Sequence, residues 1–193
     1  AFFFFFYYNN LDCFIINNSF IPTNTLNYEN KRNLRAKDWP VKDFLKGGGD
    51  RLMKNNNGIF EDVSEQAGVY GSLISFGLGV TVGDINNDGW QDVYVSNDFF
   101  ERDYLYINQQ NGSFKDELEN YIQHTSHSSM GADMADVNND GLPDIFTTEM
   151  LPDDDYRLKT TSSFENIDVN KKKIKAGFYY QYMRNMLHVN NGN

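Results

Sequence analysis

The sequence predicts an all-β fold, a partial β-propeller built from four-stranded blades, on the basis of three observations. An acidic loop at Asp84–Asp92 recurs at Asp136–Asp144, an offset of 136 − 84 = 52 residues. A second element, Leu52–Asp62, recurs at Leu105–Asp116 with one extra residue. Asparagine, which favours turns, occurs 25 times, and aromatic residues, which favour strands, make up 16% of the chain. A repeat of about 50 residues is the size of one propeller blade.

The N-terminal residues differ from the rest of the chain. Residues 2–8 are all Phe or Tyr, but this run has neither the basic start nor the small-residue cleavage site of a signal peptide. We interpret residues 1–10 as an atypical or truncated N-terminus, of a chain that begins inside a larger protein or whose start is corrupted. A buried strand is the alternative interpretation.

The first repeat unit is expected to lack its acidic loop. Asp12 aligns with Asp92 and Asp144, because the residues that follow each of them match. The same alignment places aromatic residues where the loop would carry Asp, Asn and Asp, namely Phe4, Phe6 and Tyr8.

Each complete unit is predicted to contain a strand, the acidic loop, a strand, a connection, a strand, an Asn-Gly turn and a strand. Asn57-Gly58 and Asn111-Gly112 lie between alternating apolar residues, a pattern typical of β-hairpins. We assign residues 11–193 to the partial propeller. A ring needs ~4–8 blades, so we expect the remaining blades of a parent propeller as partners of this chain.

Two insertions interrupt the period, at about 21–49 and about 151–182. Both are polar and are expected to be solvated loops or a binding surface, because insertions on one rim of a repeat fold often contact partners.

The two acidic loops predict two structural Ca²⁺ sites. Oxygen-bearing side chains fall at positions 1, 3, 5 and 9, and Gly follows position 5. Ca²⁺ takes ~6–8 oxygen ligands, so the backbone carbonyl at position 7 and water would complete the shell. Neither loop contains His or Cys, which disfavours zinc and copper. Position 12 of each loop also lacks the acid that an EF-hand requires. An Asn- and Asp-rich turn without metal is the alternative. The predicted ligands are Asp84, Asn86, Asp88, Trp90 and Asp92 in the first loop and Asp136, Asn138, Asp140, Leu142 and Asp144 in the second.

Composition excludes several classes of function. The net charge of −10 disfavours nucleic acid and anionic membranes as partners. The sequence contains no apolar run of ~18 residues, so we expect no transmembrane segment. A single Cys cannot form an internal disulfide. Neither a nucleophile elbow nor a phosphate-binding loop is present, and no other catalytic constellation is visible, so we predict that the chain is not an enzyme.

The loop pattern D-x-[DN]-x-D-G-x-x-D, preceded by Phe76-Gly77, resembles the FG-GAP repeats of integrin α-subunit propellers. It is also similar to the VCBS-type repeats of bacterial secreted and cell-surface proteins, in which the propeller often precedes an ASPIC/UnbV domain. Leu105–Phe114 resembles the strand pair of the same repeats. Two departures are the missing Gly-Ala-Pro after Gly77 and Ser129-Met130-Gly131 in place of Phe-Gly.

The resemblance implies a seven-bladed, Ca²⁺-binding propeller with an extracellular, periplasmic or outer-surface location. It also implies a binding scaffold rather than chemistry. We therefore predict a calcium-stabilised interaction module of a secreted or cell-surface protein, with a protein or glycan partner. The alternatives are a fragment of a propeller-type polysaccharide-degrading enzyme and a purely structural or adhesive repeat.

Overall fold

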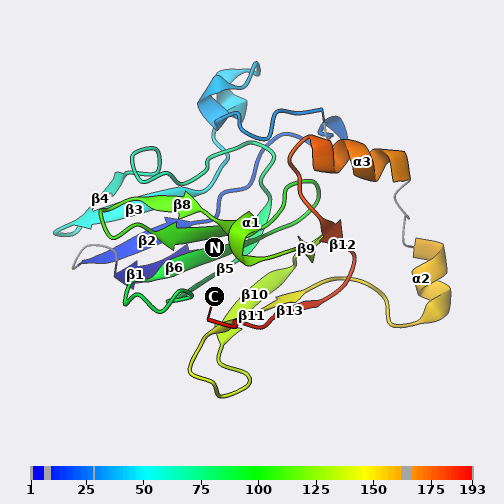
Figure 1. The fold of residues 1–193 in the computed structure, drawn as a ribbon. Helices are drawn as coiled ribbons and strands as arrows, with labels where there is room; N and C mark the ends of the chain where they lie inside the picture. Colours follow the sequence, from blue (N-terminus) through cyan, green and yellow to red (C-terminus); the bar gives the residue numbers. More distant parts are fainter. Residues whose placement is uncertain (1, 7–9, 28, 162–166, 193) are drawn as a thin grey trace.

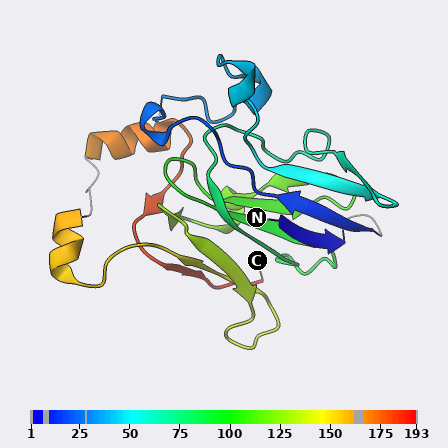
Figure 2. The same ribbon diagram turned by 180° about the vertical axis from the view of Figure 1, so that it is seen from behind.

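Three antiparallel sheets lie side by side in the computed structural model of the chain (Figure 1). The structure describes residues 2–6, 10–27, 29–161 and 167–192. Strands make up most of the regular structure, and the helices are short and lie at the periphery (Figure 2). The sheets do not close into a ring. The prediction of an all-β, partial propeller with two insertions is therefore confirmed.

Each sheet is one blade, and its strands follow one another in chain order. The first blade comprises β1 (Phe2–Phe6), β2 (Leu11–Ile15), β3 (Arg51–Asn56) and β4 (Ile59–Asp62). The second blade comprises β5 (Gly77–Gly83), β6 (Asp92–Asn97), β7 (Tyr104–Asn108) and β8 (Phe114–Asp116). The third blade comprises β10 (Gly131–Ala135), β11 (Asp144–Thr148) and β13 (Met186–His188).

The remaining elements belong to the connections. They are the short α-helix α1 (Leu118–Tyr121), the parallel pair β9 (Thr125–Ser126) and β12 (Gln181–Tyr182), and the helices α2 (Asp155–Thr161) and α3 (Ile167–Lys175). The second insertion, predicted at about 151–182, therefore carries two helices rather than an irregular loop.

Strand pairing corrects the alignment of the first blade. Asp12 lies opposite Phe5, as Asp92 lies opposite Gly83 in the second blade. Phe4, which the alignment placed at the first position of an acidic loop, instead pairs with Cys13 inside β1. The connection between the first two strands is thus shorter here than in the other blades, which a gapless alignment misses. Tyr8 lies outside the described residues, and the division of the chain at residue 10 stays a prediction.

The hydrophobic core fills the spaces between neighbouring blades. Alternate residues of a strand point to opposite faces of its sheet. Val93 and Val95 of β6 accordingly pack with Phe14 and Leu52 of the first blade. Tyr94, between the two valines, packs in a separate cluster with residues of the third blade that include Ile145. Every residue of β6 is buried, because a blade lies on each side of it.

A buried polar contact also joins the second and third blades. The Asp103 carboxylate accepts hydrogen bonds from the Tyr94 hydroxyl at 2.5 Å and from the Ser129 hydroxyl at 2.7 Å, and from the Asn97 amide at 2.8 Å. Ser129 lies just before β10, so these contacts fix the start of the third blade against the second.

The first insertion is solvated over much of its length, as expected, but it also carries a few buried apolar side chains that the sequence did not predict. Leu26 and Trp39 are 5% and 6% exposed, and they belong to one cluster with Leu73 and Phe178. Phe178 comes from the second insertion, so the two insertions share a small core. Figure 1 shows α3 of the second insertion beside the first insertion at the top of the molecule, whereas α2 lies apart at the right.

A buried ion pair anchors the first insertion to the second blade. Arg32 donates from Nε to Glu101 Oε1 at 2.5 Å, and both side chains are largely buried. Arg102 pairs with Asp116 at 2.9 Å close by. The nearby charges of Glu101 and Asp116 raise the pKa of Arg32 against the opposing effect of burial, so the guanidinium stays charged. Removing one partner of such a pair leaves a buried charge uncompensated.

We expect Trp39→Ala to destabilise the protein by about 3–5 kcal/mol, because it removes a buried aromatic side chain and leaves a cavity. The Trp39 indole N–H also donates to the Leu34 carbonyl at 3.0 Å. Phe44→Ala is the matched control, because Phe44 lies in the same insertion and is 72% exposed. Urea unfolding measures both. Equal, small effects of the two substitutions would contradict a packed core within the insertion.

Candidate metal centres

In each blade that has an acidic loop, a buried aspartate begins the second strand and accepts hydrogen bonds from two backbone amides. Asp92 accepts from the Asn108 amide at 2.8 Å and from the Ile85 amide at 2.9 Å. Asp144 accepts from the Asn190 amide at 2.8 Å and from the Val137 amide at 3.0 Å. The carboxylate thereby fastens the loop to its own blade and to the end of the blade's third strand.

Asp12 makes the equivalent contact in the first blade. Its Oδ1 accepts from the Asn55 amide at 2.6 Å, and its side chain is fully buried. The predicted equivalence of Asp12, Asp92 and Asp144 is therefore confirmed by one shared hydrogen bond to the third strand of each blade.

The two acidic loops have the same internal hydrogen bonds. Asp84 Oδ1 accepts from the Asp88 amide at 2.9 Å, and Asp84 Oδ2 accepts from the Gly89 amide at 2.8 Å. Asn86 Nδ2 donates to Asp88 Oδ2 at 3.0 Å. The corresponding distances in the second loop, from Asp136 to Gly141, are 3.0, 2.8 and 2.9 Å. Two sequences 52 residues apart thus fold into one conformation.

Left-handed backbone allows this tight turn. Asn87 and Gly89 have φ of 57° and 86°, and Asn139 and Gly141 have φ of 60° and 88°. Glycine takes this conformation without a steric penalty, and asparagine is among the side chains that tolerate it best. The Asn-Asp-Gly sequence therefore specifies the loop directly. The side chains at positions 1 and 3 both accept from one amide, that of position 5, which is Asp88 or Asp140.

The predicted ligands come together to different degrees. Asp84 and Asn86 both hydrogen-bond to Asp88, and Asp136 and Asn138 both hydrogen-bond to Asp140. Trp90 and Leu142 each donate a backbone amide to the acid at position 5, at 2.8 and 2.9 Å. Asp92 and Asp144 lie at the base of the loops, with both oxygens bound to amides. Among the described residues, no three acidic, His or Cys side chains form a group that could hold a metal ion as they stand.

The chemistry of the donors fits a hard cation. Burial raises the pKa of Asp92 to about 6, its amide hydrogen bonds oppose this, and the charges of Asp88 and Asp84 raise it further. Asp84 and Asp88 are thus close enough to Asp92 for their charges to disfavour its ionised form. Both oxygens of Asp84 and Oδ1 of Asp88 each accept a single backbone amide, which leaves each of them a second lone pair for a cation. Oxygen donors with this charge suit Ca²⁺ or Mg²⁺.

Sequence reasoning missed one contact to the first loop. The Gln110 side-chain amide donates to Asp88 Oδ2 at 3.0 Å, and Gln110 itself has φ of 61°. Gln110 lies between β7 and β8, in the segment Asn108–Phe114, which has one residue more than the matching segment Asn55–Phe60 of the first repeat. That extra residue was the one feature of the sequence that could have indicated a contact between this segment and the loop.

A protein-family model described as "FG-GAP-like repeat" matches residues 44–95 and 84–147, which together are more than half of the chain. The chain belongs to the FG-GAP-like repeat family. Each match runs from one blade into the next and ends within the strand that follows an acidic loop, β6 for the first match and β11 for the second. The family unit therefore includes the packing contact between two blades.

Three integrin α chains are similar to this FG-GAP-like protein. Integrin alpha-3 of Mus musculus is 36% identical over 91 residues, covering 42% of this chain and 8% of that protein. Integrin alpha-6 of Homo sapiens is 37% identical over 86 residues, covering 39% and 8%. Integrin alpha-7 of Mus musculus is 40% identical over 81 residues, covering 36% and 7%. The chain thus spans less than a tenth of the length of the curated relatives it matches.

The helices of the described part are too short and too polar to cross a bilayer.

We expect Asp144→Ala to destabilise the protein by about 1–3 kcal/mol, because two backbone amides lose their acceptor. Urea unfolding in the presence of EDTA measures this effect without any contribution from metal. Asp133→Ala is the control, because Asp133 is an exposed acid in β10 of the same blade. If both variants shifted the midpoint by the same small amount, the structural role of Asp144 would be wrong.

Proposed function

We propose that the chain is a calcium-stabilised propeller module that binds a protein or glycan partner on a secreted or cell-surface protein. The observation that carries this proposal is the pair of acidic loops, which share sequence, backbone conformation and hydrogen bonds. The ten predicted ligands are retained in the proposal, with Asp84, Asn86 and Asp88, and their counterparts in the second loop, as the first to engage the ion.

The proposed role of the metal is structural. Bound Ca²⁺ supplies positive charge that offsets the repulsion among the carboxylates of a loop. Asp92 and Asp144 accept hydrogen bonds from backbone amides at the base of each loop, and these bonds fix the position of the loop relative to its sheet. Sites with few charged ligands bind Ca²⁺ with Kd on the order of 10⁻⁴–10⁻³ M, which suits extracellular modules. A measured affinity in this range would agree with the proposed extracellular, periplasmic or outer-surface location.

The proposed partner surface lies on the other end of the strands. In an antiparallel blade the connection between strands one and two and that between strands two and three leave from opposite ends. The acidic loops connect strands one and two of their blades, and the two insertions connect strands two and three. Figure 1 agrees, since the β10–β11 loop lies at the bottom while α3 and the first insertion lie at the top.

Exposed apolar side chains support the assignment of this surface. Six large apolar side chains of the described part are more than 60% exposed, and five of them lie on the insertions. These five are Phe20, Phe44, Met150, Tyr156 and Ile167. Exposed apolar groups concentrated on one face are typical of interaction sites. We propose a non-catalytic role, and no described cluster favours the alternative of a polysaccharide-degrading enzyme.

Calorimetric titration of the purified protein with Ca²⁺ tests the proposal. We expect two sites with Kd on the order of 10⁻⁴–10⁻³ M, and about 1.4 kcal/mol of added stability per site at tenfold excess over Kd. Asp88→Ala combined with Asp140→Ala should abolish the heat. The charge-matched control is Asp133→Ala combined with Asp153→Ala, two exposed acids outside the loops. The proposal fails if Ca²⁺ does not bind, or if the loop variant binds it unchanged.

A further inference from the structure

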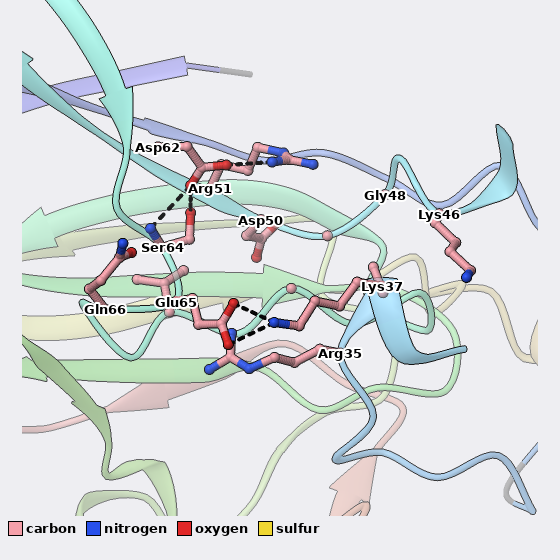
Figure 3. A pocket seen from close by; sticks show the side chains of 14 residues that line it. Arg35, Lys37, Lys46, Gly48, Asp50, Arg51, Asp62, Ser64, Glu65 and Gln66 are labelled. Atoms are coloured by element: carbon pink, nitrogen blue, oxygen red, sulfur yellow. Dashed lines mark hydrogen bonds and ion pairs between the residues drawn. The ribbon is translucent and has the colours of Figure 1, made fainter. Parts of the chain in front are cut away.

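A pocket of about 490 Å³ lies where the first insertion meets the first blade (Figure 3). Its walls come from the 3₁₀ turn Ala36–Asp38 of the insertion, from residues 46–51 before and within β3, and from residues 62–66 after β4. The acidic loops do not contribute to it. The pocket lies on the same end of the strands as the insertions, within the surface proposed above for partner binding.

A buried carboxyl group with an unused oxygen faces this pocket. Asp50 lines the pocket and is 1% exposed. Its Oδ1 accepts one long hydrogen bond, from the Asn17 amide at 3.3 Å, and its Oδ2 has no hydrogen-bond partner. Figure 3 shows the Asp50 side chain directed into the space between the walls. A buried polar atom without a partner is costly, so its retention indicates a ligand or ordered solvent that supplies a donor.

The glycines before Asp50 hold it in place. Gly49 has φ of 96°, and a Cβ there would lie 2.5 Å from the Gly71 carbonyl carbon. A Cβ on Gly48 would lie 2.9 Å from the Ser19 Cα. The glycine run, which lacks the features of a phosphate-binding loop, therefore lets the backbone pass between residues 19 and 71 and places Asp50 in the pocket wall.

Four cationic side chains line the pocket, and three of them are already paired. Lys37 binds Glu65 at 2.6 Å, Lys46 binds Asp43 at 3.1 Å and Arg51 binds Asp62. The fourth is Arg35, which forms no ion pair or side-chain hydrogen bond among the described residues and lies below Asp50 in Figure 3. Arg35 is therefore the guanidinium available to an anionic ligand.

None of these four cations forms an ion pair with the Asp50 carboxylate. Burial raises the pKa of Asp50 to about 7, and the amide of Asn17 is the described group that opposes this shift most. The pocket thus offers two unsatisfied partners of opposite kind, an acceptor at Asp50 and a cation at Arg35. Gln66 adds an amide that both donates and accepts, whereas the Ser64 hydroxyl already donates to Asp62 at 2.5 Å and accepts from the Leu52 amide at 2.9 Å.

A carboxylated sugar meets these requirements better than an ammonium ligand does. A sugar hydroxyl both donates and accepts, so it can donate to Asp50 while accepting from Gln66. A ligand carboxylate can accept two parallel hydrogen bonds from the Arg35 guanidinium. An ammonium group would enter a pocket whose four cations outnumber its three acids, Asp50, Asp62 and Glu65.

We propose that this pocket binds one carboxylated sugar unit of a glycan, with a sugar hydroxyl donating to Asp50 Oδ2 and the sugar carboxylate paired with Arg35. The inference rests on the proposed function of an interaction module and adds the class of ligand to it.

Titration of the purified protein with D-glucuronate and with D-glucose, each in Ca²⁺-containing buffer, tests the assignment. We expect glucuronate to bind at least tenfold more tightly than glucose. Arg35→Gln should remove this preference, because Gln cannot pair with the carboxylate. Asp50→Leu should abolish binding of both sugars. Lys42→Gln is the control, since Lys42 is an exposed cation of the same insertion that does not line the pocket, and it should leave the preference intact.

Several results would overturn the inference. If neither sugar binds while Ca²⁺ binding is intact, the pocket assignment is wrong and the proposed function stands, whereas loss of Ca²⁺ binding would count against the proposed function. If glycine or lysine binds in place of glucuronate and Asp50→Leu abolishes that binding, the ligand is an ammonium compound. If Asp50→Leu fails to fold, Arg35→Gln decides alone, and an unchanged preference would overturn the assignment.

Discussion

A buried carboxylate at the start of the second strand is the contact on which each blade depends. Asp12, Asp92 and Asp144 each bind the backbone amide of an asparagine at or just beyond the end of the third strand, at 2.6–2.8 Å. In the second and third blades the same carboxylate also binds an amide inside the acidic loop. One side chain therefore sets the register of the blade and the position of the loop. A net hydrogen bond to a charged group contributes about 1.5–3 kcal/mol, which is large beside the total stability of a domain.

The connections at the two ends of the strands differ in structure. At one end, short loops of fixed conformation gather carboxylates and suit a cation. At the other end, long insertions pack on one another through Trp39 and Phe178 and are fastened to the second blade through Arg32 and Glu101. The insertions can therefore differ in sequence without altering the loops, because the blade cores lie between the two. The pocket at Asp50 belongs to the insertion end, where exposed apolar side chains also gather.

Sequence reasoning succeeded where structure is local and failed where it is not. The acidic loops could be predicted because Asn87, Gly89 and their counterparts specify left-handed backbone within a few residues. The match of Asp12 to Asp92 followed from repetition alone. The contact between Arg32 and Glu101 joins residues 69 positions apart, and no periodic pattern marks it. The Asp50 pocket likewise combines four separate stretches of chain. The Phe4 register was wrong because a gapless alignment cannot detect a shortened loop.

Hydrogen exchange with and without Ca²⁺ tests most directly whether the cation stabilises these blades through their acidic loops. Exchange in residues 84–97 and 136–148 should slow on addition of about 10 mM Ca²⁺, well above the expected Kd range. Residues 51–62 of the first blade serve as an internal control and should not change, because the described part of that blade has no acidic loop. Slowing in neither loop, or equal slowing in all three regions, would contradict the proposed origin of stability.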